Sequence, residues 1–297
     1  GTTEEPMYRN KYRLIVPFLI PSILLYITFV LYPYGRAMYI SLTQWRGLSK
    51  PPVFIGLENF SKMLGDSNFW NALGNNAFYI VSLPIFTIGL ALFFAFVLTQ
   101  GARFARLYRI TFFFPQVMSM VAIGVLWSFI YHPTIGFLNS FLKLIGMSNP
   151  PVWLGNPDYV LTALSGVAVW QAVGFFMVLF IAAMESIPAT YYEAAMIDGA
   201  SQWHIFWNIT IPLIWGTIQT ALIFIMIEAT SMFTITQTMT EGGPSRGSEV
   251  LSTYLYHEAF INSNFGYGTA IAVALFFLTL FISVILTRLL RRESLEF

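Results

Sequence analysis

Residues 159–184, YVLTALSGVAVWQAVGFFMVLFIAAM, contain no charged side chain and are dominated by aliphatic and aromatic residues. About 20 apolar residues in a helix cross the hydrocarbon core of a bilayer, so this stretch predicts a transmembrane helix. Five further charge-free runs of at least 22 residues occupy 14–35, 67–102, 110–142, 199–227 and 259–287. We therefore predict an all-α polytopic membrane protein with six transmembrane helices, at about 14–34, 76–99, 110–131, 159–184, 213–236 and 267–289.

The composition agrees with a membrane protein. Of 297 residues only 10% are charged, against about 25% in soluble domains, and 15 Lys and Arg balance 14 Asp and Glu, which leaves no basic stripe for nucleic acid. The chain has no Cys and only three scattered His, so we expect no metal site. It also lacks a P-loop and a Gly-x-Ser-x-Gly motif. We expect no catalytic residue, no enzyme activity and no cofactor on this chain.

The positions of the basic residues predict the orientation. Lys and Arg gather in cytoplasmic loops, and nine of the 15 lie beside helix ends on one side of the predicted bundle, whereas six are dispersed over the opposite loops. Both termini are therefore predicted to be cytoplasmic, with a stub over 1–13, a six-helix transmembrane domain over 14–289 and a tail over 290–297. The nine residues are Arg9, Lys11, Arg13, Arg103, Arg106, Arg109, Arg288, Arg291 and Arg292.

The first apolar run is too long for a signal peptide and lacks a small-residue cleavage site, so we expect it to be retained.

The loop over residues 185–212 is predicted to be the long cytoplasmic connection between the fourth and fifth helices, yet it has no Lys or Arg. Thr190 and Glu193 have the spacing of a capping box, in which each side chain satisfies a free helix N–H group. This spacing predicts a short helix over about 191–198. Gly199 then provides a C-terminal stop, because glycine adopts the left-handed conformation easily.

The second half of this loop predicts another helix. Ser201 can cap a helix that runs toward Pro212. Two interpretations of the short helix before it remain open from the residues alone. It can lie among lipid headgroups, a position that the nearby Trp203 and Trp207 suit, or it can insert into a groove of a partner protein.

One string in this loop resembles a known motif. Glu193-Ala194-Ala195-x-x-Asp198-Gly199-Ala200, followed by Phe206, Ile209, Ile211 and Pro212, resembles the EAA motif of binding-protein-dependent ABC importer permeases; only Ile211 departs from the usual Leu. The resemblance implies a cytoplasmic coupling helix that docks on a separate ATP-binding subunit, where ATP and Mg are bound. It favours the interpretation as a partner-binding helix. The residues implied in coupling to the ATPase are Glu193, Ala194, Ala195, Asp198, Gly199 and Ala200.

Weaker similarities follow in chain order and point to the carbohydrate branch of the family, of the maltose and glycerol-3-phosphate type. The resemblance implies a permease subunit that imports a sugar or oligosaccharide across the bacterial inner membrane. It implies a second, usually different, permease subunit, an ATPase dimer and an extracytoplasmic solute-binding protein. The predicted outside loops over 35–75, 132–158 and 237–266 are either the dock for that protein or simple connectors. The similar segments are 32–45, 54–60, 170–175, 185–188 and 242–270.

Candidate residues for a substrate path are the polar side chains inside the predicted spans. Glu228 is the only charged residue there, and intramembrane charges are costly enough to suggest a function. On an ideal helix it shares a face with Thr217 and lies near Ser231. This stripe can line a cavity and accept sugar hydroxyls; alternatively, Glu228 bonds a neighbouring helix or partner permease, or reaches water.

Trp170 and Gln171 are the other candidates for the path. An aromatic face can stack on a pyranose ring, and an amide can bridge adjacent hydroxyl groups. The alternative is helix packing for Trp170 and an interhelical hydrogen bond for Gln171.

The alternative function is a six-span secondary transporter or channel that works without an ATPase. Such a protein is expected to contain several intramembrane ionisable residues or inverted repeats. The predicted spans contain one Glu, and the two halves of the chain show no repeat. The sequence therefore favours the ATP-driven importer.

Overall fold

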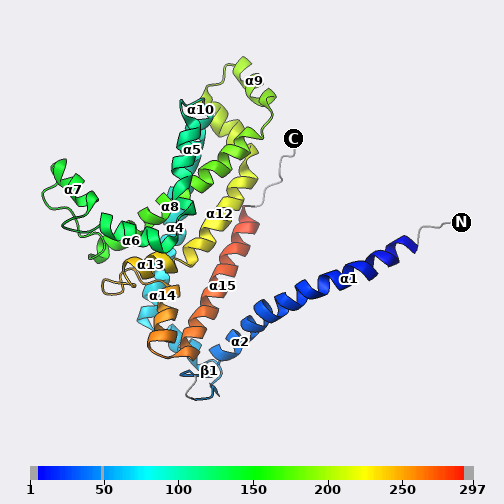
Figure 1. Cartoon of the computed structure of the whole chain (residues 1–297), viewed down its shortest axis with the longest axis vertical. Coiled ribbons are helices and arrows are strands. Elements are labelled where there is room, and N and C mark those ends of the chain that lie inside the picture. Colours follow the sequence, from blue (N-terminus) through cyan, green and yellow to red (C-terminus); the bar gives the residue numbers. More distant parts are fainter. Residues whose placement is uncertain (1–5, 48–49, 291–297) are drawn as a thin grey trace. The chain divides into compact units, whose positions relative to one another are not determined.

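The computed structural model describes residues 6–47 and 50–290, with the backbone alone for 6–14 and 16. It is mostly helical (Figure 1). The predicted stub falls partly, and the tail almost wholly, outside these residues, so Arg291 and Arg292 have no structural test. The chain divides into two compact units, described separately below: Gly1–Gly65 with Leu255–Val273, and Asp66–Tyr254 with Ala274–Phe297.

The first unit contains a long apolar helical segment followed by a short two-stranded β-hairpin. The segment Pro17–Ser41 is apolar and long enough to cross a membrane. After it, Thr43 pairs with Phe54 and Gln44 with Val53 in an antiparallel hairpin. The described elements are α1 (Pro6–Tyr26), the π-helical turn η1 (Ile27–Leu31), α2 (Tyr32–Ser41), β1 (Thr43–Gln44), β2 (Val53–Phe54), α3 (Glu58–Leu64) and η4 (His257–Ile261).

Side-chain and backbone bonds fix the hairpin within this unit. The buried Asn59 amide donates to the carbonyls of Ser41 and Thr43, at 2.8 and 2.9 Å. Gly266 N–H donates to the Trp45 carbonyl at 3.1 Å, and an added Cβ at Gly266 would lie 2.1 Å from the Thr43 oxygen. Only glycine therefore permits this approach of two backbones.

The second unit is a helical bundle built around α4 and α8. Both are among its longest helices, and α8 has buried side chains on every face, as expected for a helix that is apolar all round. The elements are α4 (Ser67–Thr99), α5 (Ala105–Phe113), the 3₁₀ turn η2 (Phe114–Val117), α6 (Met120–Ile130), α7 (Phe137–Leu144), α8 (Pro157–Glu185), α9 (Ala189–Ile197), α10 (Gln202–Ile205), η3 (Phe206–Thr210), α11 (Ile211–Leu213), α12 (Trp215–Thr230) and α13 (Phe233–Met239). Two more helices, α14 (Leu251–Tyr256) and α15 (Phe265–Leu289), run across the division between the units.

The candidate membrane spans agree with the prediction in part. Within the described residues, four helices are long and apolar enough to cross a membrane, and two bent pairs bring the number to six if each pair is one span. The four are Pro17–Ser41, Ser67–Thr99, Pro157–Glu185 and Phe265–Leu289. They overlap the predicted helices at 14–34, 76–99, 159–184 and 267–289.

The two remaining predicted helices are not continuous. The pair Ala105–Val117 and Met120–Ile130 bends by 103°, where the chain passes through a 3₁₀ turn containing Pro115 and then an extended Ser119. The pair Gln202–Leu213 and Trp215–Thr230 bends by 72°. A single helix over 110–131 is therefore wrong, and so is one over 213–236, because α12 ends at Thr230.

Two asparagines of α4 bind the end of α12 and the start of α14 through hydrogen bonds. Asn75 donates to the Glu249 carbonyl at 2.8 Å. Asn76 is fully buried; its amide donates to the Thr230 carbonyl at 3.0 Å, and its oxygen accepts from Leu251 N–H at 2.8 Å. The Asn76 side chain thus satisfies two buried backbone groups, the Thr230 carbonyl and the Leu251 N–H, which would be paired within a continuous helix. Asn76 thereby fixes where α12 stops.

Candidate coupling loop and membrane cavity

The short helix of the 185–212 loop starts differently from the prediction. Helix α9 begins at Ala189, its N-cap is Pro188, and no side chain caps it. Tyr191 N–H donates to the Pro188 carbonyl at 3.2 Å. Thr190 is therefore already helical and cannot be the N-cap, so the capping box with Glu193 is wrong. The fixed φ of proline prepares the chain for a helix without a polar cap.

The end of α9 agrees with the prediction. Gly199 has a φ of +78° and follows the last turn, and its N–H donates to the Met196 carbonyl at 3.1 Å. Ala200 N–H donates to the Ala195 carbonyl at 2.9 Å. These two bonds form a Schellman-type stop. Ser201 then caps α10 as predicted, with its hydroxyl accepting from His204 N–H at 3.2 Å.

Helix α9 presents most of the motif outward. Figure 1 shows it projecting beyond the end of α8. Glu193, Ala194 and Asp198 are exposed, and Ile197 retains 85% of its accessible surface. Ala195 is the exception, because it is buried against the bundle. The helix therefore exposes two carboxylates and the apolar Ile197, whereas Ala195 packs against the bundle.

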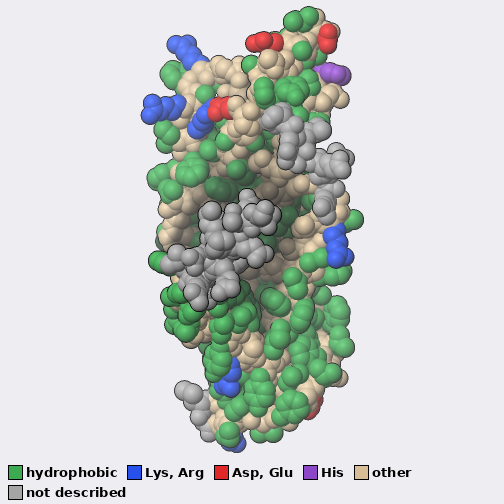
Figure 2. Space-filling view, turned by 90° about the vertical axis from the view of Figure 1, so that its right-hand side faces the viewer, with side chains coloured by type: hydrophobic (Ala, Val, Ile, Leu, Met, Phe, Trp, Pro, Cys, Tyr) green, Lys and Arg blue, Asp and Glu red, His purple; other side chains and the backbone are tan. Residues whose placement is uncertain are grey.

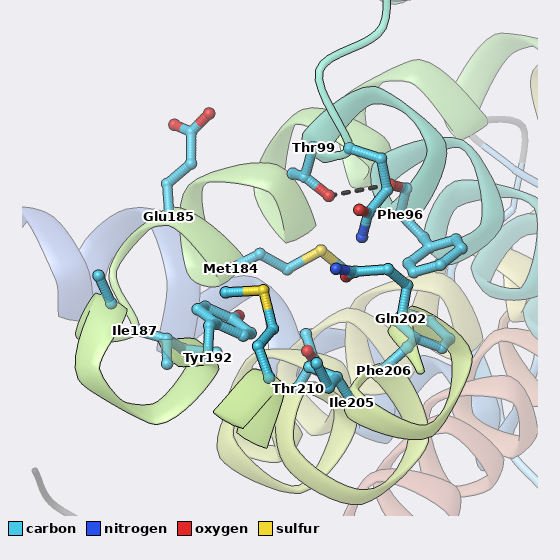
Figure 3. Close-up of a pocket in the computed structure, with 13 residues that line it drawn as sticks. Phe96, Thr99, Met184, Glu185, Ile187, Tyr192, Gln202, Ile205, Phe206 and Thr210 are labelled. Carbon is cyan, nitrogen blue, oxygen red and sulfur yellow. Dashed lines mark hydrogen bonds between the residues drawn. The ribbon is translucent and has the colours of Figure 1, made fainter. Parts of the chain in front are cut away.

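A cavity of about 350 Å³ lies behind α9, between it and the ends of α4 and α8. In Figure 3, Met184, Tyr192 and Gln202 point toward this space, whereas Glu185 points away from it. Glu185 instead pairs with Arg109 at 2.6 Å, which ties the end of α8 to α5. Flexible Met and Gln side chains fill irregular space without fixing a single arrangement. Helix α9 is therefore separated in part from the ends of α4 and α8 by this cavity.

The surface around this loop differs from the surface beyond it. Figure 2 shows basic, acidic and His side chains gathered at the end of the second unit formed by α5, α9 and α10, with mainly hydrophobic side chains next to it. Arg103, Arg106 and Arg109 belong to this charged end. Charges beside an apolar belt are typical of the boundary between membrane and water.

A second cavity of about 140 Å³ lies inside the bundle of the second unit. Its polar lining includes Gln171, Glu228 and Ser231, three of the five residues predicted for a substrate path. Thr217 lies about three turns earlier on α12 and does not line this cavity. Trp170 does not line it either; its ring packs edge-on against Trp127, with centroids 5.4 Å apart. Of the five residues predicted from the sequence, Gln171, Glu228 and Ser231 therefore lie together at this cavity, and Thr217 and Trp170 do not.

The cavity is positioned by a helix break. Ser231 has a φ of −120° and a ψ of 43° and separates α12 from α13. Broken helices within membranes are typical of substrate sites, because they bring backbone groups to a cavity. The Gln171 side-chain amide donates to the side-chain oxygen Oε1 of Gln116 at 2.7 Å, so Gln116 orients the cavity amide. Sequence reasoning missed Gln116, although an amide within a charge-free run was a usable signal.

Within the described residues, no three His, Asp or Glu side chains gather closely enough to hold a metal ion. The described polar groups of the two sites are hydroxyls, amides and isolated carboxylates. Such an arrangement suits binding and positioning of hydroxyl-bearing molecules or protein surfaces.

Comparison with known proteins identifies the class. Residues 77–294 match the model of the binding-protein-dependent transport system inner membrane component. The chain is 37% identical to the diacetylchitobiose uptake system permease protein NgcF of Streptomyces coelicolor, over 91% of this chain and 80% of that protein. It is 36% identical to the probable ABC transporter permease protein YurN of Bacillus subtilis, over 91% and 94% of the two chains. The chain belongs to the family of binding-protein-dependent transport system inner membrane components, which are membrane transport subunits and not enzymes.

A solved structure shows the same fold. It is described as the bacterial alginate ABC transporter in complex with an alginate pentasaccharide-bound periplasmic protein. The TM-score is 0.83 at 20% identity, over 98% of this chain and 99% of that chain. The chain therefore shares the overall fold of that solved structure.

Proposed function

We propose that this chain is the permease subunit of an ATP-driven importer that takes up a sugar or oligosaccharide. The proposal includes six spans with both termini in the cytoplasm of a bacterium, and placement in its inner membrane. It is supported by the names of two similar proteins, of which one takes up diacetylchitobiose and the other transports alginate. An extracytoplasmic solute-binding protein would deliver the sugar, and a second permease subunit would complete the pathway.

The observation that carries the proposal is the outward face of α9. The exposed Ala194 adds little bulk to this side of the helix, and Glu193 and Asp198 can pair with basic groups in a groove of the partner. The partner would be a dimeric ATP-binding subunit, which supplies ATP and Mg because this chain has no P-loop. The cavity behind α9 leaves room for the helix to move when the ATP-binding dimer closes. Such a movement would shift the equilibrium between two conformations of the transporter.

Cross-linking tests this docking directly. The chain has no Cys, so Ile197→Cys introduces a single thiol at a position of α9 that is 85% exposed. A maleimide–diazirine reagent couples to this thiol and, on illumination in native membranes, inserts into any chain beside it. It is expected to join α9 to a chain that contains a P-loop, identified by mass spectrometry. Asn149→Cys, also exposed, is the matched control and should give no such product. An Ile197→Cys variant that labels fully but never joins an ATP-binding chain contradicts the docking.

The inner cavity supports a second part of the proposal, the contact with sugar hydroxyls. Glu228→Gln removes the charged acceptor but keeps its shape. A hydrogen bond to a charged group contributes about 1.5–3 kcal/mol, so uptake at limiting sugar is expected to fall about tenfold or more. Cross-linking of α9 should stay unchanged.

The matched control for this variant is Glu241→Gln, which alters an exposed carboxylate. It is expected to leave uptake of the labelled sugar at the wild-type level. If Glu228→Gln and the wild type take up limiting sugar equally, Glu228 does not contact the substrate.

A further inference from the structure

Helix α7 in the second unit presents an apolar side that the proposed transport cycle does not use. Phe137, Phe141 and Leu144 retain 73%, 49% and 85% of their accessible surface. At 3.6 residues per turn these three side chains fall within an arc of about 60°. The rings of Phe137 and Phe141 stack with centroids 6.4 Å apart. Ile145, directly after the helix, adds a further side chain that is 65% exposed.

Another side of α7 is fastened to the protein. Asn139 is almost fully buried, and its amide donates to the carbonyls of Pro133 and Pro151, at 3.2 and 3.3 Å. Its oxygen accepts from Trp153 Nε1–H at 2.7 Å. These bonds fix the rotation of the helix about its axis. The apolar arc is therefore held outward by the structure rather than exposed by chance.

The third side of α7 is polar. Ser140 and Lys143 are exposed; Ser140 borders the apolar arc, and Lys143 lies about 100° from its nearest member, Leu144. Lys143 is also the only charged residue between Arg109 and Asp158. The helix thus has one side for the protein, one for water and one for an apolar medium, the pattern of an interfacial amphipathic helix.

The position of α7 along the chain places it at a membrane boundary. It begins shortly after Ile130, where the bent pair that can form one span ends. Next to that end, Tyr131 packs against Trp127 and Trp153, with centroids 5.2 and 6.0 Å apart. Trp and Tyr gather at the level of the lipid headgroups.

Helix α6, which precedes α7 in the chain, also exposes apolar side chains that suit contact with lipid. Val125, Leu126 and Phe129 of α6 are exposed by 47%, 42% and 64%. Helix α6 packs against α7 within the same unit. A lipid surface therefore accounts for both apolar regions together, whereas a protein partner would have to cover each of them.

We infer that α7 lies in the headgroup boundary of one leaflet and binds a phospholipid surface. Phe137, Phe141 and Leu144 enter the acyl chains, and Lys143 meets phosphate groups, to which cations near a membrane surface are attracted. The contact anchors the 131–158 segment beside the bundle. It also holds α6 at its bent position during transport.

Spin-label accessibility tests this placement. Single-Cys variants Phe141→Cys and Leu144→Cys are labelled in the full chain, which has no Cys of its own, and reconstituted in phosphatidylcholine–phosphatidylglycerol nanodiscs without other proteins. Oxygen partitions into acyl chains and a nickel chelate stays in water. The ratio of oxygen to nickel accessibility is expected to be several-fold higher at 141 and 144 than at Lys143→Cys.

Two results would overturn the inference. Equal nickel accessibility at 141, 143 and 144 would place the apolar arc in water. Labels at 141 and 144 that are immobile and shielded from both reagents would show a protein contact instead. The Ser140→Cys variant keeps the apolar arc intact, so its thermal stability shows whether labelling itself disturbs the fold.

Discussion

Gly199→Val is expected to reduce ATP-dependent uptake by at least about tenfold while the protein still accumulates in the membrane. Gly199 has a φ of +78° and closes α9. A side chain there meets no atom within 4 Å, so the effect arises from the backbone. A residue with a Cβ pays about 1–2 kcal/mol in the left-handed conformation, and a β-branched residue is the least suited to it. The end of α9 would unwind, and its outer face would lose the shape that fits a groove.

Gly199→Asn is the matched control for this prediction. Asparagine adopts the left-handed conformation more readily than valine, so it should retain a large part of the uptake. Uptake is measured with radiolabelled sugar, and recruitment of the ATPase by copurification from the same membranes. If Asn is as damaging as Val, the backbone explanation fails. If Val transports normally, the geometry at the end of α9 has no role in coupling.

Gly174→Ala is expected to destabilise the bundle more than any other single methyl addition among the glycines of the second unit. An added Cβ would lie 1.8 Å from the Phe112 carbonyl oxygen and 2.3 Å from its carbon. These atoms are backbone, so no side-chain rotation relieves the clash, and α8 must separate from α5. Overpacking of a core costs about 1–3 kcal/mol and sometimes more. We expect a clear drop in the thermal midpoint of the detergent-solubilised chain.

Gly89→Ala provides the control, because a Cβ at this exposed position of α4 meets nothing within 4 Å. Alanine in a helix is more favourable than glycine by roughly 0.5–1 kcal/mol, so the midpoint should stay equal or rise. A Gly174→Ala chain that melts together with Gly89→Ala would contradict the close approach of α8 to Phe112.

The sequence predicted the apolar helices well because each is bounded by charges. The breaks at Ser119 and Ser231 were missed, since each residue interrupts its helix through non-helical backbone angles. Beside the second break, the Thr230 carbonyl accepts from Asn76, a residue far away in the chain. The bonds of Asn76 to Thr230 and Leu251 fix the end of α12, and no local pattern shows them. Hydropathy averages over such single-residue breaks.

The candidate sites were predictable to different degrees. Gly199 and Ser201 act locally, and both behave as the motif predicted. The prediction of Thr190 as the N-cap failed because the N-cap of α9 is Pro188, two residues earlier. Gln171, Glu228 and Ser231 meet at one cavity, but helical spacing alone could not exclude Thr217, because the break at Ser231 decides which part of the face lines it.

The central claim is that this chain moves a sugar through the membrane when an ATPase acts on α9. The most direct measurement is uptake of radiolabelled oligosaccharide into proteoliposomes that contain the complete transporter, with its binding protein added outside and ATP sealed inside. Uptake is predicted to need both ATP and the binding protein, and to be lost on deletion of residues 193–200 in a chain that still reaches the membrane. Uptake that continues without ATP, or in the deletion variant, would contradict the claim.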